Sequence, residues 1–535
     1  MHLFELHSGA ALRLAVGFGL AACGIVAGLV MVRAPRARYL AAPIIAVPVA
    51  LIAACAWAIV LGLTPAIAVL LGRAGTAMVG AGILVGAGLC TGLFSVRRAP
   101  RARVWRGTVV LDATGARLLR GRHGKKALRF AGEQVPAADE AKHFKLLGTT
   151  GTGKSTAIRE LLAGALRRGD AAVIADPDGG YLDAFYEPGR GDALLNPFDA
   201  RSRRWDLFGE LAADYDSDLV ARALIAEHAG DERTWRVYAR VFLASLLRQL
   251  RRAGERDVAT LHRLIVSAPV AELALLLDGT AAGPYLSADN ARFFASIRAV
   301  ATTQLAALEH LGEPRTGATL SVRRWVREVA AGSRHGALFL PYRAGQAATL
   351  RNLISTWMRL AIFETMEQSE TDHRLWFVID ELDALGAIDG LKDALARLRK
   401  FGGRCVLGLQ SIAQITGTYG PQDAQTIIEN CGNTLILRCS ASESGGTARF
   451  ASRLIGDREV VREQVTRASG GALGPGRRSR SITFQHVTEP AVLAAEIEQL
   501  PDLAGYLKFA SAATWRRIEA FGTVRVRDSA STRGQ

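Results

Sequence analysis

The pattern of apolar and polar residues divides the chain into two parts. Up to residue 106, apolar runs predominate, each long enough to cross the hydrocarbon core of a bilayer as a helix. These runs lie near residues 11–32, 42–63 and 75–95. Arginine-rich segments at 33–38 and 97–106 flank the runs, and the positive-inside rule places such segments in the cytoplasm. The pattern predicts a three-span membrane anchor over residues 1–106, with the N-terminus outside.

The first apolar run also has an interpretation as a secretory signal peptide, because Ala22 and Cys23 follow an apolar stretch. No Lys/Arg-rich segment precedes the apolar part, and further apolar runs come after it. A retained anchor is therefore the favoured interpretation. A two-span anchor would require one of the runs to be interfacial or re-entrant.

From residue 144 the pattern becomes that of an α/β domain. Short continuous apolar runs, typical of parallel strands covered on both faces, alternate with helix-like segments. The predicted strands are 144–147, 171–175, 335–342, 375–382 and 404–410, and the predicted helices include 155–168, 345–366 and 388–400. Residues 217–311 interrupt this alternation with apolar positions three and four apart, as in 235–250 and 261–277, which predicts an all-α insertion.

These patterns predict four regions. They are the anchor (1–106), a nucleotide-binding domain (107–206 and 321–525) that opens with a β-rich lead-in (107–135), an all-α domain (207–320) and a disordered tail (526–535).

A phosphate-binding loop follows the strand at 144–147. The sequence Gly148-x-x-x-x-Gly153-Lys154-Ser155 has the spacing at which backbone N–H groups converge on phosphate oxygens, and a helix-like segment follows it. Lys154 is expected to contact the β- and γ-phosphates of ATP, and Ser155 to bind Mg²⁺. The predicted nucleotide-binding residues are Gly148, Thr149, Thr150, Gly151, Thr152, Gly153, Lys154, Ser155 and Thr156. A chance glycine-rich turn is the alternative.

Two adjacent carboxylates end the apolar run LWFVIDEL. At the carboxyl end of a parallel strand they would face the same crevice as the phosphate loop. Asp380 is then expected to hold Mg²⁺ through water, and Glu381 to orient and deprotonate the attacking water. Gln410, at the end of the next predicted strand, would sense the γ-phosphate or position water. A strand that merely ends in polar residues is the competing interpretation.

Charge adds little evidence for DNA binding. The net charge is +16, but residues 1–106 carry +9 of it and residues 107–129 a further +5, which leaves +2 for the rest of the chain. The high pI is therefore mainly a membrane-topology signal. The six cysteines include no Cys-x-x-Cys pair, which argues against a structural zinc site and fits a reducing compartment.

Six motifs in order resemble the type IV secretion and conjugation coupling proteins of the TraD/TrwB kind, which are relatives of the FtsK–HerA DNA pumps. The motifs are HFKLLGTTGTGKST, VIADPDGG, LLNPFDARSRRWDLF, LWFVIDEL, RLRKFGGRCVLGLQSIAQ and EIEQLPDLAGYLKFA, between about residues 140 and 520. The resemblance implies an α/β, RecA-like P-loop domain with an inserted all-α domain, anchored in the bacterial inner membrane by transmembrane helices. It also implies a hexamer that hydrolyses ATP with Mg²⁺ in the cytoplasm.

The resemblance further implies partners and roles. The partners are single-stranded DNA with its relaxase and relaxosome, and the proteins of a type IV secretion channel. Glu381 and Gln410 would act in catalysis, and Arg399 would reach the nucleotide of a neighbouring subunit, with Arg397 as the alternative. Two other functions stay open: a receptor that recruits cargo without pumping, and an FtsK-like translocase of double-stranded DNA.

The chain also departs from the family pattern. Members typically have two membrane spans rather than three, and some carry a long acidic tail that docks relaxosome proteins. Here the segment after residue 522 is short and rich in arginine and serine. The glycine-rich segment 470–481 is expected to be a mobile, solvated loop, although its Arg477, Arg478 and Arg480 are able to contact phosphates.

Overall fold

The structure is a computed structural model. It describes residues 16, 19–30, 42, 44–53, 80–91, 103–112, 127–226, 232–311, 319–370, 373–442, 445–468, 479–519 and 521. The chain divides into two compact units, one comprising residues 1–103 and 461–487, the other residues 104–460 and 488–535.

A ten-stranded sheet forms the centre of the larger unit, in the order β2-β17-β16-β13-β5-β12-β11-β6-β10-β7. Its strands are β2 (Val110–Leu111), β5 (Phe144–Leu147), β6 (Ala171–Pro177), β7 (Ala193–Leu194), β10 (Ala337–Tyr342), β11 (Leu375–Ile379), β12 (Gly403–Leu409), β13 (Asn433–Ile436), β16 (Gly505–Lys508) and β17 (Trp515–Ile518). The seven strands from β13 to β7 are parallel, whereas β16 pairs antiparallel with β13 and β17. The predicted parallel α/β domain is confirmed.

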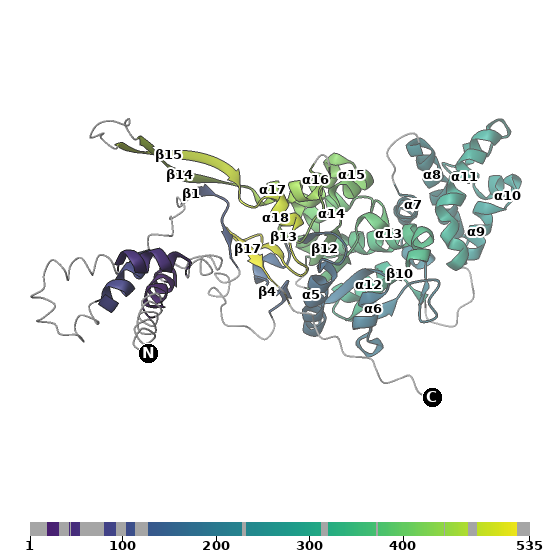
Figure 1. Cartoon of the computed structure of the whole chain (residues 1–535). Helices are drawn as coiled ribbons and strands as arrows, with labels where there is room; N and C mark the ends of the chain where they lie inside the picture. The colour runs from purple at the N-terminus through teal and green to yellow at the C-terminus, as the bar shows by residue number, and fades with distance from the viewer. Residues whose placement is uncertain are drawn as a thin grey trace, which may run out of the picture. The chain divides into compact units, whose positions relative to one another are not determined.

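Helices cover both faces of this sheet (Figure 1). On β11, Trp376 and Val378 pack with α5 (Lys154–Arg168), while Phe377 and Ile379 belong to a second core that includes α13 (Ala344–Glu367) and α14 (Leu391–Arg397). Successive residues of a strand point to opposite faces, so continuous apolar strands require two such cores. The remaining helices of the sheet domain are α6 (Gly180–Phe185), α15 (Ile412–Tyr419), α16 (Pro421–Asn430), α17 (Gly446–Ile455) and α18 (Ala494–Glu498).

Short elements complete the connections of the sheet domain. They are the strand pair β3 (Arg129–Phe130) and β4 (Glu133–Gln134) and the 3-10 helices η1 (Ala137–Asp139), η2 (Pro188–Arg190), η7 (Asp383–Leu385) and η8 (Leu398–Phe401).

An all-α part is inserted between β8 (Arg204–Trp205) and β9 (Thr319–Leu320), two short strands that pair in parallel. It contains η3 (Phe208–Glu210), α7 (Asp216–Leu224), α8 (Glu232–Arg252), α9 (Val258–Val266), α10 (Val270–Leu276), η4 (Gly283–Leu286), η5 (Ala288–Asn290), α11 (Ala291–Leu305) and η6 (Ala306–Leu311), and α12 (Val322–Ala330) follows β9. The amphipathic segment 261–277 is broken between α9 and α10 at Pro269, which has no N–H to donate and disfavours helical geometry in the residue before it.

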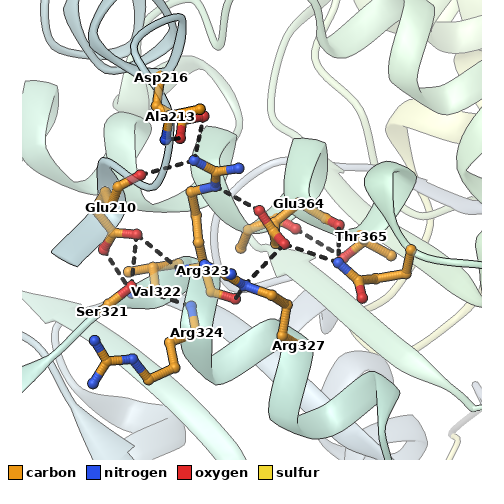
Figure 2. A network of polar contacts seen from close by, with 12 residues as sticks. Glu210, Ala213, Asp216, Ser321, Val322, Arg323, Arg324, Arg327, Glu364 and Thr365 are labelled. Carbon is orange, nitrogen blue, oxygen red and sulfur yellow. Dashed lines mark hydrogen bonds and ion pairs between the residues drawn. The ribbon is translucent and has the colours of Figure 1, made fainter.

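A buried ionic network joins the all-α part to the sheet domain (Figure 2). Figure 2 shows Arg323 between the carboxylates of Asp216 and Glu364; its Nη1 lies 2.6 Å from Asp216 Oδ1, and its Nε donates to Glu364 Oε2. Glu210 accepts four hydrogen bonds, from Trp205 Nε1, Ser321 Oγ and the backbone N–H groups of Val322 and Arg323. The network ties η3 and α7 to α12 and α13 at the place where the chain leaves and re-enters the sheet domain.

In the smaller unit, residues 19–30, 44–53 and 80–91 are helical. Gly24 and Gly88 allow close packing: a Cβ on Gly24 would lie 2.4 Å from Val85 O, and one on Gly88 would lie 2.3 Å from Ala21 O. Within the described part of the chain, no helix is both long and apolar enough to cross a membrane. Much of each predicted span (11–32, 42–63 and 75–95) lies outside the described residues.

Strands β1 (Arg103–Gly107), β14 (Asp457–Ala468) and β15 (Ser479–Pro490) form a separate sheet in the order β1-β14-β15. The expected loop at 470–481 is wrong at its end, because Ser479–Ser481 continue the ladder of β15. Residues 470–478 and the predicted tail at 526–535 lie outside the described residues.

Candidate functional site

The predicted phosphate loop connects β5 to α5. Its chain reversal uses left-handed glycines, Gly151 with φ 78° and Gly153 with φ 114°, a region that side-chain-bearing residues seldom occupy. Lys154 begins α5, is only 7% exposed, and donates from Nζ to Gly148 O (2.6 Å) and Thr149 O (3.1 Å). Burial lowers the pKa of Lys154, and the charges of Asp380 and Glu381 oppose that shift. Two backbone carbonyls of the loop thus hold the buried ammonium group of Lys154.

The other predicted loop residues surround this lysine. Thr149 N donates to Arg438 O (2.9 Å), and Thr152 Oγ1 donates to Thr149 O (2.7 Å), so both threonines stabilise the loop. Thr150 Oγ1 lies 3.4 Å from Gln410 Oε1. Thr156 is half-buried in the first turn of α5.

Parallel register brings the remaining predicted residues to the same edge. β12 lies between β5 and β11, and β6 follows β11, so the carboxyl ends of four neighbouring strands meet beside the loop. Ser155 Oγ donates to Asp380 Oδ2 (2.6 Å), and Gln410 Nε2 donates to Glu381 Oε1. In each of these two pairs, the side chains come from separate predicted motifs and are in direct contact with each other.

Glu381 has the electrostatics of a proton acceptor. Burial raises its pKa above the ordinary value of 4.5, and the neighbouring charges of Asp380 and Asp383 add to the increase. Lys154 and the hydrogen bond from Gln410 act in the opposite direction. A carboxylate held above its ordinary pKa, yet bound by an amide donor, is suited to orienting water and accepting its proton.

Two residues of the site were missed from the sequence: Asp176 and Tyr181. Asp176 is fully buried at the end of β6, accepts the N–H groups of Tyr181 and Leu182, and has its pKa raised to about 6 by burial. Tyr181, in α6, donates its hydroxyl to Asp380 Oδ2 (2.8 Å). The polar turn Asp176–Gly180 after a buried strand was the available signal, because it predicts a position at the carboxyl edge.

Arg399 lies away from these residues. It sits in η8, immediately before β12 begins, whereas the phosphate loop follows the opposite, carboxyl end of β5. His143, directly before β5, confirms the amino edge: its ring contacts Leu395 O and Cys405 N. Arg397 ends α14 at the same edge. The chain therefore does not bring its own Arg399 or Arg397 to its own phosphate loop, and the expected role across subunits stays a prediction.

The residues at this edge fit a magnesium ion with nucleotide. Asp380 is 5% exposed, and its Oδ1 has no hydrogen-bond donor among the described residues, although Oδ2 has two. A hydroxyl and a carboxylate with few protein partners are typical of Mg²⁺ sites that keep water and phosphate ligands. In the described part of the chain, no group of three or more His, Cys, Asp or Glu side chains is placed to hold a metal ion.

Comparisons with known proteins agree with this geometry. Residues 127–520 match the family model described as the type IV secretion-system coupling protein DNA-binding domain. The chain is 31% identical over 394 residues to the coupling protein TraD of Escherichia coli (strain K12), a match that covers 73% of this chain and 54% of TraD. The match thus spans about half the length of that relative.

Solved structures of the plasmid coupling protein TrwB are similar over most of their length. TrwB in complex with the non-hydrolysable ATP analogue ADPNP matches with a TM-score of 0.69 and 31% identity, over 82% of this chain and 99% of TrwB. TrwB in complex with ADP and Mg²⁺ matches with a TM-score of 0.68 and 30% identity, over 80% of this chain and 96% of TrwB. The resemblance drawn from the motifs is confirmed, and the chain belongs to the family of type IV secretion-system coupling proteins.

Proposed function

We propose that this chain is a coupling ATPase that drives single-stranded DNA, with its relaxase, towards a type IV secretion channel during conjugation. The observation that carries the proposal is the joining of two pairs, Ser155–Asp380 and Glu381–Gln410, at the carboxyl edge beside Lys154. Binding alone would need the loop and a metal ligand; hydrolysis also needs a group that activates water. Glu381 and Gln410 form such a group.

ATP and Mg²⁺ are the proposed substrate and cofactor. Backbone N–H groups of residues 148–156 would cradle the phosphates, and Lys154 would exchange its contacts with loop carbonyls for phosphate oxygens. Ser155 and Asp380 would hold Mg²⁺, which when bound offsets charge on the β- and γ-phosphate oxygens. The TrwB complexes with ADPNP and with ADP and Mg²⁺ support this assignment.

Glu381 is proposed to orient the attacking water and accept its proton, while Gln410 holds the Glu381 carboxylate in place. Thr150, 3.4 Å from Gln410, links this pair to the phosphate loop, so the amide is placed to respond to the nucleotide. Arg399 is proposed to act on the nucleotide of a neighbouring chain. Its place at the amino edge supports a role in trans, because it cannot reach the loop of its own chain.

The proposed assembly is a homo-hexamer anchored in the bacterial inner membrane, with the nucleotide domain in the cytoplasm. Three long apolar runs flanked by arginines support the anchor. Close helix packing at Gly24 and Gly88 supports it further, since small residues commonly mediate helix contacts in membranes. The family model, described as a DNA-binding domain, supports DNA as a partner.

The test compares Lys154→Ala and Glu381→Gln in the full chain. Glu381→Gln should keep nucleotide binding but lower ATP turnover by at least about 100-fold, because the water-activating carboxylate is lost. Lys154→Ala should weaken nucleotide binding and lower turnover to a similar extent. Measurements are ATP hydrolysis with and without single-stranded DNA, binding of a fluorescent ADP analogue, and DNA transfer between cells.

DNA transfer that survives both substitutions would favour a receptor that recruits cargo without pumping. If double-stranded DNA but not single-stranded DNA stimulates ATP hydrolysis, the result would favour an FtsK-like translocase. For Arg399, mixing Arg399→Ala chains with Glu381→Gln chains should restore part of the hydrolysis at mixed interfaces. If no mixture restores any activity, Arg399 has no role across the interface.

A further inference from the structure

Tyr181 is a buried side chain that has no role in the proposed hydrolysis. It is 2% exposed and lies in α6, a short helix that follows β6. Its hydroxyl donates to Asp380 Oδ2 at 2.8 Å, across 199 positions of sequence. An ionised carboxylate oxygen only accepts hydrogen bonds, so at this distance the Tyr181 hydroxyl is the donor.

This hydrogen bond divides the two oxygens of Asp380 into different roles. Oδ2 accepts from both Ser155 Oγ (2.6 Å) and Tyr181 (2.8 Å). Oδ1 is buried and has no hydrogen-bond donor among the described residues. A carboxylate with both donors on one oxygen is fixed in rotation about its Cβ–Cγ bond, and its other oxygen stays available to a metal-bound water.

Tyr181 is itself held firmly. Its N–H donates to Asp176 Oδ1 (3.0 Å), and the N–H of Leu182 donates to Asp176 Oδ2 (2.7 Å). The guanidinium carbon of Arg159, from α5, lies 5.6 Å from the centre of its ring. Asp176 and Arg159 thus anchor the tyrosine from β6 and from the helix that carries Ser155.

We propose that Tyr181 is a positioning residue for the magnesium ion, one that fixes Asp380 so that Oδ1 is presented to the ion and Oδ2 retains Ser155. The inference rests on the proposed function, since it deepens the role of the same site. Groups that hold the ligands of a metal usually contribute 10- to 100-fold to metal affinity, and this bond is of that kind.

The test is Tyr181→Phe in the full chain, which removes one hydroxyl and keeps the buried ring. Binding of a fluorescent ADP analogue is titrated with Mg²⁺ at fixed nucleotide. The Mg²⁺ concentration for half-maximal binding should rise by about tenfold, while binding measured in EDTA should be unchanged. Tyr506→Phe is the matched control, because Tyr506 is also 2% exposed but lies in β16, on the far side of β13 from β5.

The possible results separate the two proposals. If wild type shows no Mg²⁺-dependent nucleotide binding, the proposed function fails. If wild type shows it and Tyr181→Phe has the same Mg²⁺ dependence, Tyr181 merely satisfies its own buried hydroxyl, and the positioning role is rejected while the proposed function stands. A lower thermal midpoint with an unchanged Mg²⁺ dependence would likewise reject it.

Discussion

Two buried carboxylates of this chain each accept a serine hydroxyl, yet their surroundings differ. Glu210, at the junction of the all-α part, accepts from Ser321 Oγ (2.9 Å) and has two donors on each of its oxygens. Asp380, at the nucleotide site, accepts from Ser155 Oγ (2.6 Å) but has one oxygen without a donor among the described residues. A buried acceptor without a donor reduces stability, and a bound ligand, ion or water is one means of completing it.

Charge shows the same contrast. At the junction, Arg323 contacts two carboxylates, those of Asp216 and Glu364, and all three side chains are at least nine-tenths buried. At the nucleotide site, Lys154 bonds to neutral backbone carbonyls. The first arrangement is complete within the chain, whereas the second leaves a cation able to take an anionic ligand. We therefore expect substitutions at the junction to affect stability, and substitutions at the site to affect ligand binding.

The largest effect on stability is expected from Arg323→Met. The substitution leaves Asp216 buried without its cation and leaves Glu364 with Arg327 alone, which should lower the free energy of unfolding by about 3–5 kcal/mol. Denaturant unfolding followed by circular dichroism measures this loss. Arg263→Met is the control, because Arg263 forms an exposed ion pair with Glu272, and water screens the attraction between exposed charges. Equal losses in the two variants would contradict the comparison.

A smaller effect, and one that depends on pH, is expected from Asp176→Asn. The pKa of Asp176 is raised from 3.8 to about 6, so between these values the folded chain keeps a proton that the unfolded chain has lost. The contribution of Asp176 to stability therefore falls as pH rises through this window, by up to about 3 kcal/mol. Asparagine does not titrate. The thermal midpoint of Asp176→Asn should thus improve relative to wild type between pH 4 and pH 7; a constant difference would contradict the expectation.

The smallest effect is expected from the matched serines. Ser321 is also the N-cap of α12, and Ser321→Ala should lower stability by about 1 kcal/mol without changing Mg²⁺-dependent nucleotide binding. Ser155→Ala should do the reverse, weakening that binding with less than about 1 kcal/mol lost from stability. Unfolding and nucleotide titrations of both variants provide the measurement. Exchanged outcomes would remove the distinction between a structural and a functional carboxylate.

The sequence predicted the loop, strands and strand-end carboxylates that short segments specify. The spacing from Gly148 to Ser155 predicted the loop, and continuous apolar runs predicted β5, β10 and β11 to within a few residues. Asp380 and Glu381 were placed at the right edge because parallel strands end together. These inferences needed only short segments and one rule of topology.

The other features of the site and the junction depend on contacts between residues far apart in the sequence, which no local pattern specifies. Tyr181 and Asp380 are 199 positions apart, and Arg323 meets Glu364 across 41 positions and two helices. The sequence around an arginine on an amphipathic helix, or around a tyrosine in a short helix, does not indicate which distant residue that side chain contacts. The proline at position 269 was a signal in the sequence for the break between α9 and α10, because proline disfavours a continuous helix. The apolar periodicity on both sides of it favoured one helix instead.

The paired strands β8 and β9 have a consequence for the length of the all-α insertion between them. They hold the two ends of the all-α insertion beside each other, Trp205 opposite Leu320. The entropy lost on closing a loop grows slowly with its length, by about 0.6 kcal/mol for each doubling. Once the ends are fixed, a change in the length of the inserted segment beyond η3 and α7 adds little to the entropy of closing it, whereas η3 and α7 are tied to the sheet domain by the Arg323 network. The helices beyond α7 are thus the part of the insertion whose length the closed ends constrain least.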